Sequence, residues 1–217
     1  MATDKKGNLY VIDGDRILQI DSKGGVTTLA NEPGQYLGGI AVDMSDNVVY
    51  AVSNGEPTYH YAEVRTCGAI RKISFGVIST VAGASTFPCP ESGNAPTDGN
   101  GTSAKFASIV ALSISSTGSL YTADAFGWNP SAGRSWPVWR IAATDSVGNV
   151  TTITTGDLPS TNSLFTQVSG DLYSFNPSTI DKTRGTDCWW CSYDFTRSPN
   201  GKDFYAVGHN ALLLIRP

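Results

Sequence analysis

The chain has 217 residues, which is enough for one ordinary domain with a full core. Only 16% of its residues are charged, against about 25% in a typical globular protein, and 23 glycines favour many short strands and turns. The formal net charge of −4 and the absence of a Lys/Arg cluster exclude nucleic-acid binding through phosphates, and no apolar run is long enough for a membrane span.

The first unit reads as four short strands separated by turns. Its strands a to d have alternating or β-branched patterns, and Gly, Asp and Lys mark the turns between them. Strand a ends at Ala2 to Asp4, and strands b, c and d are Asn8 to Asp13, Arg16 to Ile20 and Gly25 to Ala30. Such a pattern predicts a four-stranded antiparallel meander.

The unit recurs along the chain, which predicts an all-β fold of propeller blades in a single domain, 1–217. Aromatic-tipped b strands mark the units and align Tyr10, Tyr50, Tyr121, Tyr173 and Tyr205 as equivalent packing residues. The fourth and fifth units are degenerate, and the last has no strand d. The predicted blades are 1–30, 36–83, 104–156, 160–183 and 192–217. We therefore expect four to five blades in an open or incompletely closed arc, either by itself or as a fragment of a larger ring. A β-sandwich is the alternative.

Three segments resemble parts of NHL repeats. Ala69 to Ile73 with Gly76 to Gly83 looks like the end of such a repeat, and Thr97 to Phe106 looks like the linker that opens the next. Gly118 to Asp124 looks like a central strand. The resemblance covers 1–156 well and the remainder weakly. It implies an NHL-type β-propeller, a family whose members act as ligand-binding platforms, docking modules and, in a few cases, enzymes.

Loop lengths predict which end of the blades carries function. The a–b and c–d turns are short, whereas the long segments Asn54 to Gly68, Ala84 to Ala104 and Ala125 to Pro137 are b–c or d–a connections. An antiparallel meander places the b–c and d–a connections at one end. Long loops on a rigid scaffold commonly carry function.

The long loops are rich in aromatic residues, which suit carbohydrate or protein partners. The candidate ligand-binding residues are Tyr59, His60, Tyr61, Phe126, Trp128 and Trp136. The alternative is that these aromatics pack into a small core of the loops themselves. His209, in a short turn at the same end, is a further candidate for a metal or a general base, as is His60.

The four cysteines lie on long segments, Cys67 and Cys89 on two of those named above and Cys188 and Cys191 on a further one, Asn176 to Cys191. Cys188 and Cys191 have C-x-x-C spacing, for which a structural disulfide, a metal site, redox chemistry and free thiols all stay open. Cys67 and Cys89 fall on two loops of the same end, so a bond between them is geometrically reasonable. We expect disulfides at Cys67, Cys89, Cys188 and Cys191.

Two features of the sequence indicate the cellular compartment. Asn100 and Asn149 begin N-x-T glycosylation acceptors, and the cysteine number is even. Both favour an extracellular or cell-surface location. No signal peptide precedes Ala2. We interpret the given sequence as a fragment, or as one that lacks its true start, rather than as a cytosolic protein.

Acidic residues give little catalytic signal. Asp13 and Asp124 end equivalent b strands, with Ser53 and Gly208 in that place elsewhere, so we interpret them as turn caps rather than a carboxylate ring. No catalytic residue, metal site or cofactor is predicted.

We expect a non-enzymatic propeller that binds a protein or carbohydrate partner. The alternatives are a metal-dependent hydrolase or lyase, resembling propeller lactonases or amidating lyases, and a truncated remnant without activity of its own.

Overall fold

The computed structural model describes residues 1–53, 68–83, 96–115, 117–125 and 139–156, and five further strands within 165–215. Among these residues, all regular elements are β-strands apart from one short 3-10 helix, η1 (Gly101–Ser103). Every strand pair is antiparallel. The predicted all-β class with antiparallel sheets is therefore confirmed.

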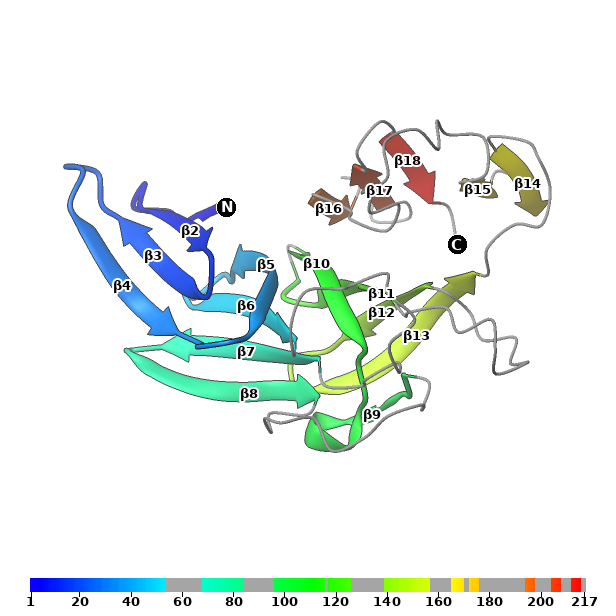
Figure 1. Ribbon diagram of the computed structural model, residues 1–217, viewed down its shortest axis with the longest axis horizontal. Coiled ribbons are helices and arrows are strands. Elements are labelled where there is room, and N and C mark those ends of the chain that lie inside the picture. The colour runs from blue at the N-terminus through cyan, green and yellow to red at the C-terminus, as the bar shows by residue number, and fades with distance from the viewer. Residues whose placement is uncertain are drawn as a thin grey trace.

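The first three sheets each contain a four-stranded meander in chain order, and Figure 1 shows the three side by side from blue to yellow. The first sheet is β1 (Ala2–Thr3), β2 (Leu9–Asp13), β3 (Arg16–Ile20) and β4 (Val26–Asn31). The second is β5 (Tyr36–Val42), β6 (Val48–Ser53), β7 (Ala69–Ser74) and β8 (Val77–Gly83). The third is β10 (Ser108–Ile114), β11 (Leu120–Ala125), β12 (Trp139–Thr144) and β13 (Asn149–Gly156). Such meanders are the units of propeller architecture.

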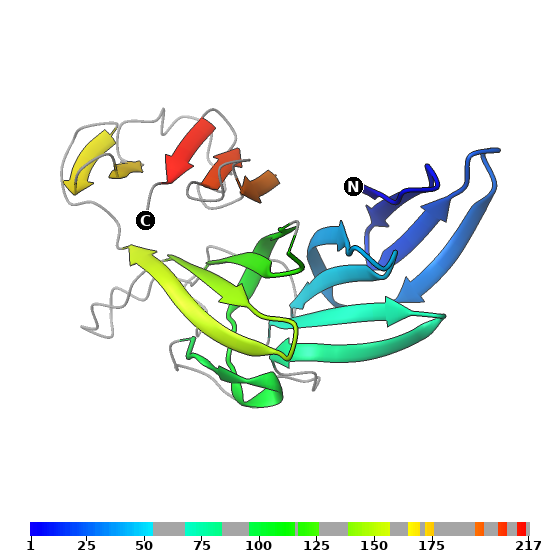
Figure 2. The same cartoon turned by 180° about the vertical axis from the view of Figure 1, so that it is seen from behind.

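Two smaller sheets follow in the C-terminal part. One pairs β14 (Phe165–Ser169) with β15 (Leu172–Phe175), and the other orders β16 (Asp194–Arg197), β17 (Phe204–Val207) and β18 (Leu212–Ile215). The view from behind in Figure 2 shows the same separation of these strands from the first sheet as Figure 1.

The third sheet gains a strand that the sequence did not predict. The segment before it forms β9 (Gly99–Asn100), which pairs with the outer strand β13, and then η1. Isolated bridges join Gly68 to Phe106 and Thr97 to Lys105. The linker that resembles an NHL repeat opening is thus folded onto the outer edge of the sheet that it precedes.

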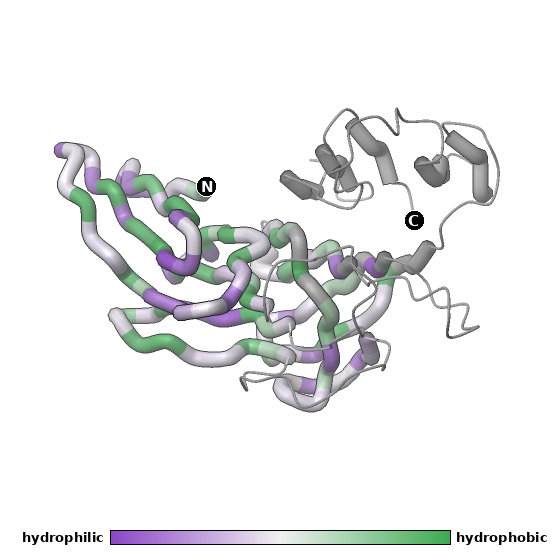
Figure 3. The backbone as a smooth tube through the Cα atoms, in the orientation of Figure 1, coloured by the Kyte–Doolittle hydropathy of each residue, from purple (hydrophilic) through white to green (hydrophobic). Residues whose placement is uncertain are grey.

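Two apolar clusters hold the three sheets together. Successive strand residues point to opposite faces, so each sheet gives one face to each neighbour; Figure 3 shows the hydrophobic positions spread along the strands. The cluster between the first and second sheets contains Tyr10, Ile17, Ala30, Leu37, Ile40, Val48, Tyr50, Val52, Ala69 and Ile73. The cluster between the second and third contains Ala41, Val49, Ala51, Ile70, Ala82, Ala104, Phe106, Ile109, Leu112, Leu120, Ala142 and Val150.

Five-residue turns close one end of the sheets. In each, the amide of the first residue bonds to the carbonyl of the fifth, and the amide of the fourth bonds back to the carbonyl of the first. The first side chain accepts from the amides of the third and fifth residues at 2.8 to 2.9 Å when it is Asp. These turns begin at Asp4, Asp21, Asp43, Ser115 and Asp145.

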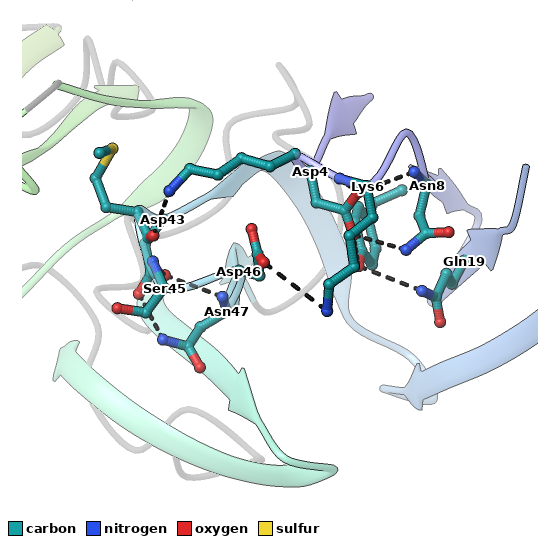
Figure 4. A network of polar contacts seen from close by, with 11 residues as sticks. Asp4, Lys6, Asn8, Gln19, Asp43, Ser45, Asp46 and Asn47 are labelled. Atoms are coloured by element: carbon teal, nitrogen blue, oxygen red, sulfur yellow. Dashed lines mark hydrogen bonds and ion pairs between the residues drawn. The ribbon is translucent and has the colours of Figure 1, made fainter.

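Figure 4 shows two of these turns beside each other. Lys6 of the first turn lies 4.0 Å from the carboxylate of Asp46 in the second. The fourth turn residue has a positive φ, +82° at Gly7 and +61° at Asp46. A left-handed residue at this place is why glycine occupies it in most of the turns, and aspartate tolerates it better than most residues do.

The turns give a better alignment of the sheets than the tyrosines, and they correct one prediction. Counting from the turns sets Val49, not Tyr50, beside Tyr10 and Tyr121. Tyr50 is buried, as expected of a packing residue, but it points to the opposite face, into the cluster that contains Tyr10. Its hydroxyl donates to Glu32 at 2.8 Å, and burial raises its pKa.

We expect the turn carboxylates to matter for stability. Asp43→Ala removes three hydrogen bonds, those from Ser45 N, Asn47 N and Asn47 Nδ2, and should lower the free energy of unfolding by about 1–3 kcal/mol. Urea unfolding measures the change. Lys23→Ala, an exposed position within another of these turns, is the matched control and should change stability by less than about 0.5 kcal/mol. Equal losses in the two variants would contradict the role of the carboxylate.

Within the described residues, no helix has the length and apolar character to cross a membrane.

Candidate functional site

The end of the sheets opposite the five-residue turns is where the long connections leave the strands. The predicted ligand-binding residues Tyr59, His60, Tyr61, Phe126, Trp128 and Trp136 lie outside the described residues, as do Cys67, Cys89, Cys188, Cys191 and His209. These predictions stay predictions. What the structure describes at this end is the base on which the connections stand.

The main feature of this base is a buried ion pair, Asp124 with Arg140. Asp124 lies near the end of β11 and Arg140 near the start of β12, and the antiparallel register sets them directly opposite. Oδ2 of Asp124 accepts from Nη2 of Arg140 at 2.7 Å and from Nε at 3.2 Å. The Arg140 side chain is 2% exposed and that of Asp124 is fully covered. Two side chains from neighbouring strands, at the same end of the sheet, thus form a buried ion pair beneath the connections.

Arg140 also holds the segment that precedes the third sheet. Its Nη2 donates to the carbonyl of Lys105 at 2.9 Å, and its guanidinium carbon lies 5.2 Å from the centre of the Phe106 ring. A guanidinium at this distance from an aromatic ring is attracted by its π-electrons. One arginine therefore joins the third sheet to the folded linker.

Asp98 extends the network to the outer strand. It accepts from the amide of Thr152 at 2.9 Å and from its hydroxyl at 2.6 Å, and it lies 3.5 Å from Nη1 of Arg140. Its side chain is about half exposed, at 47%. The network therefore runs from a buried carboxylate, through Arg140, to a carboxylate that reaches solvent.

Burial dominates the electrostatics of Asp124. Desolvation raises the pKa of its carboxyl to about 6, against the opposing effects of the Arg140 charge, the Arg140 hydrogen bonds and a backbone hydrogen bond from Ala107. Three other oxygens of the third sheet resemble Oδ1 of Asp124, being buried without a hydrogen-bond partner: those of Ser113, Thr122 and Thr144. Thr122 and Thr144 share the Asp124 face of the sheet. Unpartnered buried oxygens are rare and mark places that ordered water or a polar ligand atom can satisfy.

The raised pKa predicts a pH dependence. An acid whose folded-state pKa lies above its unfolded value binds more protons when folded, so its contribution to stability falls as pH rises between the two values. Burial raises the pKa of Asp124 from the ordinary 3.8 to about 6. The contribution of Asp124 to the free energy of unfolding should therefore decline between roughly pH 4 and pH 6. Urea unfolding of the wild type and of Asp124→Asn at pH 4.5 and 6.5 measures it. The difference between the two proteins should change with pH in this sense, and a pH-independent difference would contradict the assignment.

The interpretation of Asp13 and Asp124 as turn caps is wrong for Asp124. It is the buried partner of Arg140, and the backbone hydrogen bond that it accepts comes from Ala107 of another segment. Asp13 forms the equivalent pair with Arg16 in the first sheet, but there both side chains are 50% exposed. Aligned by the turns, the residue of the second sheet equivalent to Asp13 and Asp124 is Val52, not Ser53. Ser53 instead accepts the amide of Ile109 through Oγ at 3.0 Å.

The predicted glycosylation residues lie together on neighbouring strands. Asn100 of β9 pairs directly with Asn149 of β13, and Nδ2 of Asn100 donates to Oδ1 of Asn149 at 2.5 Å. Nδ2 of Asn149 donates to Asp145 at 2.8 Å within the five-residue turn. Both side chains are exposed, at the end of the sheet away from Arg140. The structure places the two acceptors side by side, and their modification stays a prediction.

Arg140 and Asp98 are the residues that sequence reasoning missed. One signal could have found Arg140: Asp ends strand b and Arg begins strand c in both the first and third units. Among the described residues, no three of His, Cys, Asp and Glu stand close enough to hold a metal ion.

Comparison with known proteins gives distant structural likenesses. No protein-family model matches the sequence, and no curated protein matches it, so NHL membership stays a resemblance. One similar solved structure is a gluconolactonase of Xanthomonas campestris, described as important in glucose secondary metabolic pathways. It has 14% identity and a TM-score of 0.47, over 96% of this chain and 53% of that one.

A second similar structure comes from a structural genomics consortium and is described there as a gluconolactonase by prediction. It has 12% identity and a TM-score of 0.40, over 94% of this chain and 67% of that one. The chain thus spans about half the length of the first relative. A likeness at this level says nothing about what this chain binds or catalyses.

Proposed function

We propose that the chain is a propeller of four to five blades, open or incompletely closed, that binds a carbohydrate or protein partner. The binding surface is the end of the sheets where β2, β6 and β11 finish and the long connections begin. The candidate contact residues are those of the sequence prediction, with Trp128 and the Tyr59 to Tyr61 segment foremost.

The difference between the two ends of the sheets carries this proposal. At one end, five-residue turns satisfy their own backbone and side-chain groups. At the other end, the Asp124–Arg140–Asp98 network fixes the base of the connections to three strands and the folded linker. A rigid base beneath long aromatic connections is the usual arrangement of a binding surface on a β scaffold.

The test is capture of ligands by the purified chain. An oligosaccharide array and a random-peptide display library are probed with the wild type, Trp128→Ala and Phe75→Ala. Phe75 is a fully exposed aromatic residue in a turn at the opposite end, so it is the matched control. Trp128→Ala should lose at least about tenfold in affinity, the effect of truncating one binding hot spot, and Phe75→Ala should retain it. Absence of any captured ligand, or equal losses, would contradict the proposal.

A second function is favoured by one observation, the raised pKa of a carboxyl at the same end. A buried carboxyl with a pKa of about 6 is a candidate acid or base, so a hydrolase that acts on lactones is the alternative. Asp124 is 1% exposed, and a substrate would have to reach it past the linker. The wild type should then hydrolyse gluconolactone, as measured by proton release with added divalent cations. The rate of hydrolysis should be lower in Asp124→Asn. No hydrolysis above the uncatalysed rate would exclude this reading.

For the compartment, we propose an extracellular or cell-surface location. Support comes from the exposure of both acceptor side chains. When the chain is directed through a eukaryotic secretory pathway, Asn100→Gln with Asn149→Gln should abolish a mobility shift on gels. No shift for the wild type would contradict the proposal.

A further inference from the structure

Two buried threonines lie on the face of the third sheet that packs against the second. Thr122 of β11 and Thr144 of β12 are each 0% exposed, and neither hydroxyl has a hydrogen-bond partner among the described residues. A buried hydroxyl without a partner is costly, so most buried polar groups in folded proteins have one. Two such groups on one face therefore indicate a binding site for a polar molecule.

The register places these two threonines close together. Thr144 lies opposite Leu120, and Thr122 lies opposite Ala142, so the threonines are diagonal neighbours on one face of the sheet. Such neighbours are about 7–8 Å apart, with their Cβ atoms somewhat closer. One water molecule that bonds to two hydroxyls spans up to about 5.5 Å, since each O–H···O bond is about 2.8 Å long. The separation thus suits a single bridging water.

The surroundings of the two threonines favour a neutral ligand. Their cross-strand neighbours all belong to the apolar cluster between the second and third sheets: Leu112, Leu120, Ala142 and Val150. Asp124, which comes next on this face of β11, is already paired with Arg140. An ion bound here would be buried without a counter-ion, at a large cost. The ligand must therefore be uncharged, and it must be able both to donate and to accept hydrogen bonds.

The second sheet has larger side chains at the equivalent positions. Counted from the five-residue turns and the register, Thr122 corresponds to Tyr50, and Thr144 corresponds to Ile73. Both of these pack between the first and second sheets. Isoleucine has no polar group to satisfy, and the hydroxyl of Tyr50 donates to Glu32 at 2.8 Å. The unpartnered hydroxyls are thus a property of the third sheet and not of these positions in the fold.

The residues that face the two threonines are also smaller than their counterparts. Val49 and Ala51 of the second sheet belong to the cluster that packs against the third. Counted from the turns, they take the places of Tyr10 and Ile12, which pack between the first and second sheets. Smaller side chains on both sides of one interface favour the inclusion of a molecule as small as water.

We propose that Thr122 and Thr144 together bind one ordered water molecule in the core between the second and third sheets. Each hydroxyl forms one hydrogen bond with this water, which satisfies both groups at once. Buried waters commonly serve otherwise unsatisfied polar groups in this way and are costly to remove. The water site is separate from the proposed binding surface at the long connections and does not depend on it.

The test is urea unfolding of the full chain as wild type, Thr122→Val, Thr144→Val and the double variant. Valine has nearly the shape of threonine but lacks the hydroxyl, so each single substitution breaks the bridge and should raise the unfolding equilibrium constant about fivefold. The double variant should be no less stable than either single variant, because the second valine removes a hydroxyl that has already lost its partner. Thr27→Val, at an exposed position of β4, is the matched control and should change the constant by no more than about twofold.

Two results of this experiment would overturn the proposal. Hydroxyls without a water predict the opposite sign, since each valine would then remove an unpartnered polar group and lower the unfolding constant. Independent losses, in which the effects of the two single substitutions multiply in the double variant, would show that the hydroxyls do not share one water.

A high-resolution crystal structure of the wild type gives a second measurement, which holds even if a valine variant fails to fold. Electron density for a water within about 2.5–3.0 Å of both hydroxyls is expected. Density that shows no water between Thr122 and Thr144 would overturn the proposal.

Discussion

Arg140→Met should lower the free energy of unfolding by about 3–5 kcal/mol, because it leaves the Asp124 carboxylate buried without its cationic partner. Asp124 accepts two side-chain hydrogen bonds, both from Arg140, and its side chain is fully covered. The change also removes the donor to Lys105 O and the contact with the Phe106 ring. Urea unfolding followed by tryptophan fluorescence and circular dichroism measures the loss.

The chain provides a matched control for this substitution. Arg16→Met breaks the equivalent pair in the first sheet, where both side chains are half exposed, and exposed pairs contribute about 0–1 kcal/mol. The double variant Asp124→Asn with Arg140→Met should recover part of the loss, since the buried charge is gone. Similar losses for Arg140→Met and Arg16→Met would show that burial of the pair does not determine its contribution.

Gly83→Ala should cost about 2–5 kcal/mol, from two sources that add. Gly83 ends β8 with φ +90°, a conformation that disfavours any Cβ by roughly 1–2 kcal/mol. A Cβ there would also lie 2.4 Å from the carbonyl oxygen of Gly68 and 2.8 Å from the Phe106 ring. These neighbours are buried backbone and a buried ring, so relief requires shifts in the packed cluster, at about 1–3 kcal/mol.

Gly7→Ala separates the two sources. Gly7 has nearly the same φ, +82°, but nothing lies within 4 Å of its Cβ position, so only the conformational cost of roughly 1–2 kcal/mol remains. Thermal and urea unfolding of both variants give the difference. If Gly83→Ala were no more destabilising than Gly7→Ala, the close approach of β8 to Gly68 and Phe106 would not exist in solution.

The strands could be predicted from the sequence because their determinants are local. Period-two patterns and β-branched residues in Arg16 to Ile20 and Val77 to Gly83, bounded by Gly and Asp, appear as β3 and β8 in the structure. The five-residue turns are also local, since an Asp side chain bonds amides two and four residues later. The register error at Tyr50 arose because an aromatic residue was used as the marker instead of the turn, and one residue of shift reverses the face.

The ion network could not be predicted in the same way because its partners are distant along the chain. Arg140 bonds to Lys105 and Asp98 only after the linker folds onto the outer edge of the third sheet. Strand β9 depends on the same event, since two residues make a strand only beside a preformed edge. Asp124 reads as a turn residue by type, and only the tertiary fold buries it.

The most direct test of the central claim, that function resides at the end opposite the five-residue turns, is hydrogen exchange with bound ligand. The oligosaccharide or peptide captured by the wild type is added at saturating concentration, and amide exchange is followed by mass spectrometry. Protection should be confined to peptides that cover 54–68, 84–98 and 125–138. The turn peptides that contain Asp43 to Asn47 and Asp145 to Asn149 should exchange unchanged. Protection of those turns, with none in the long connections, would contradict the account.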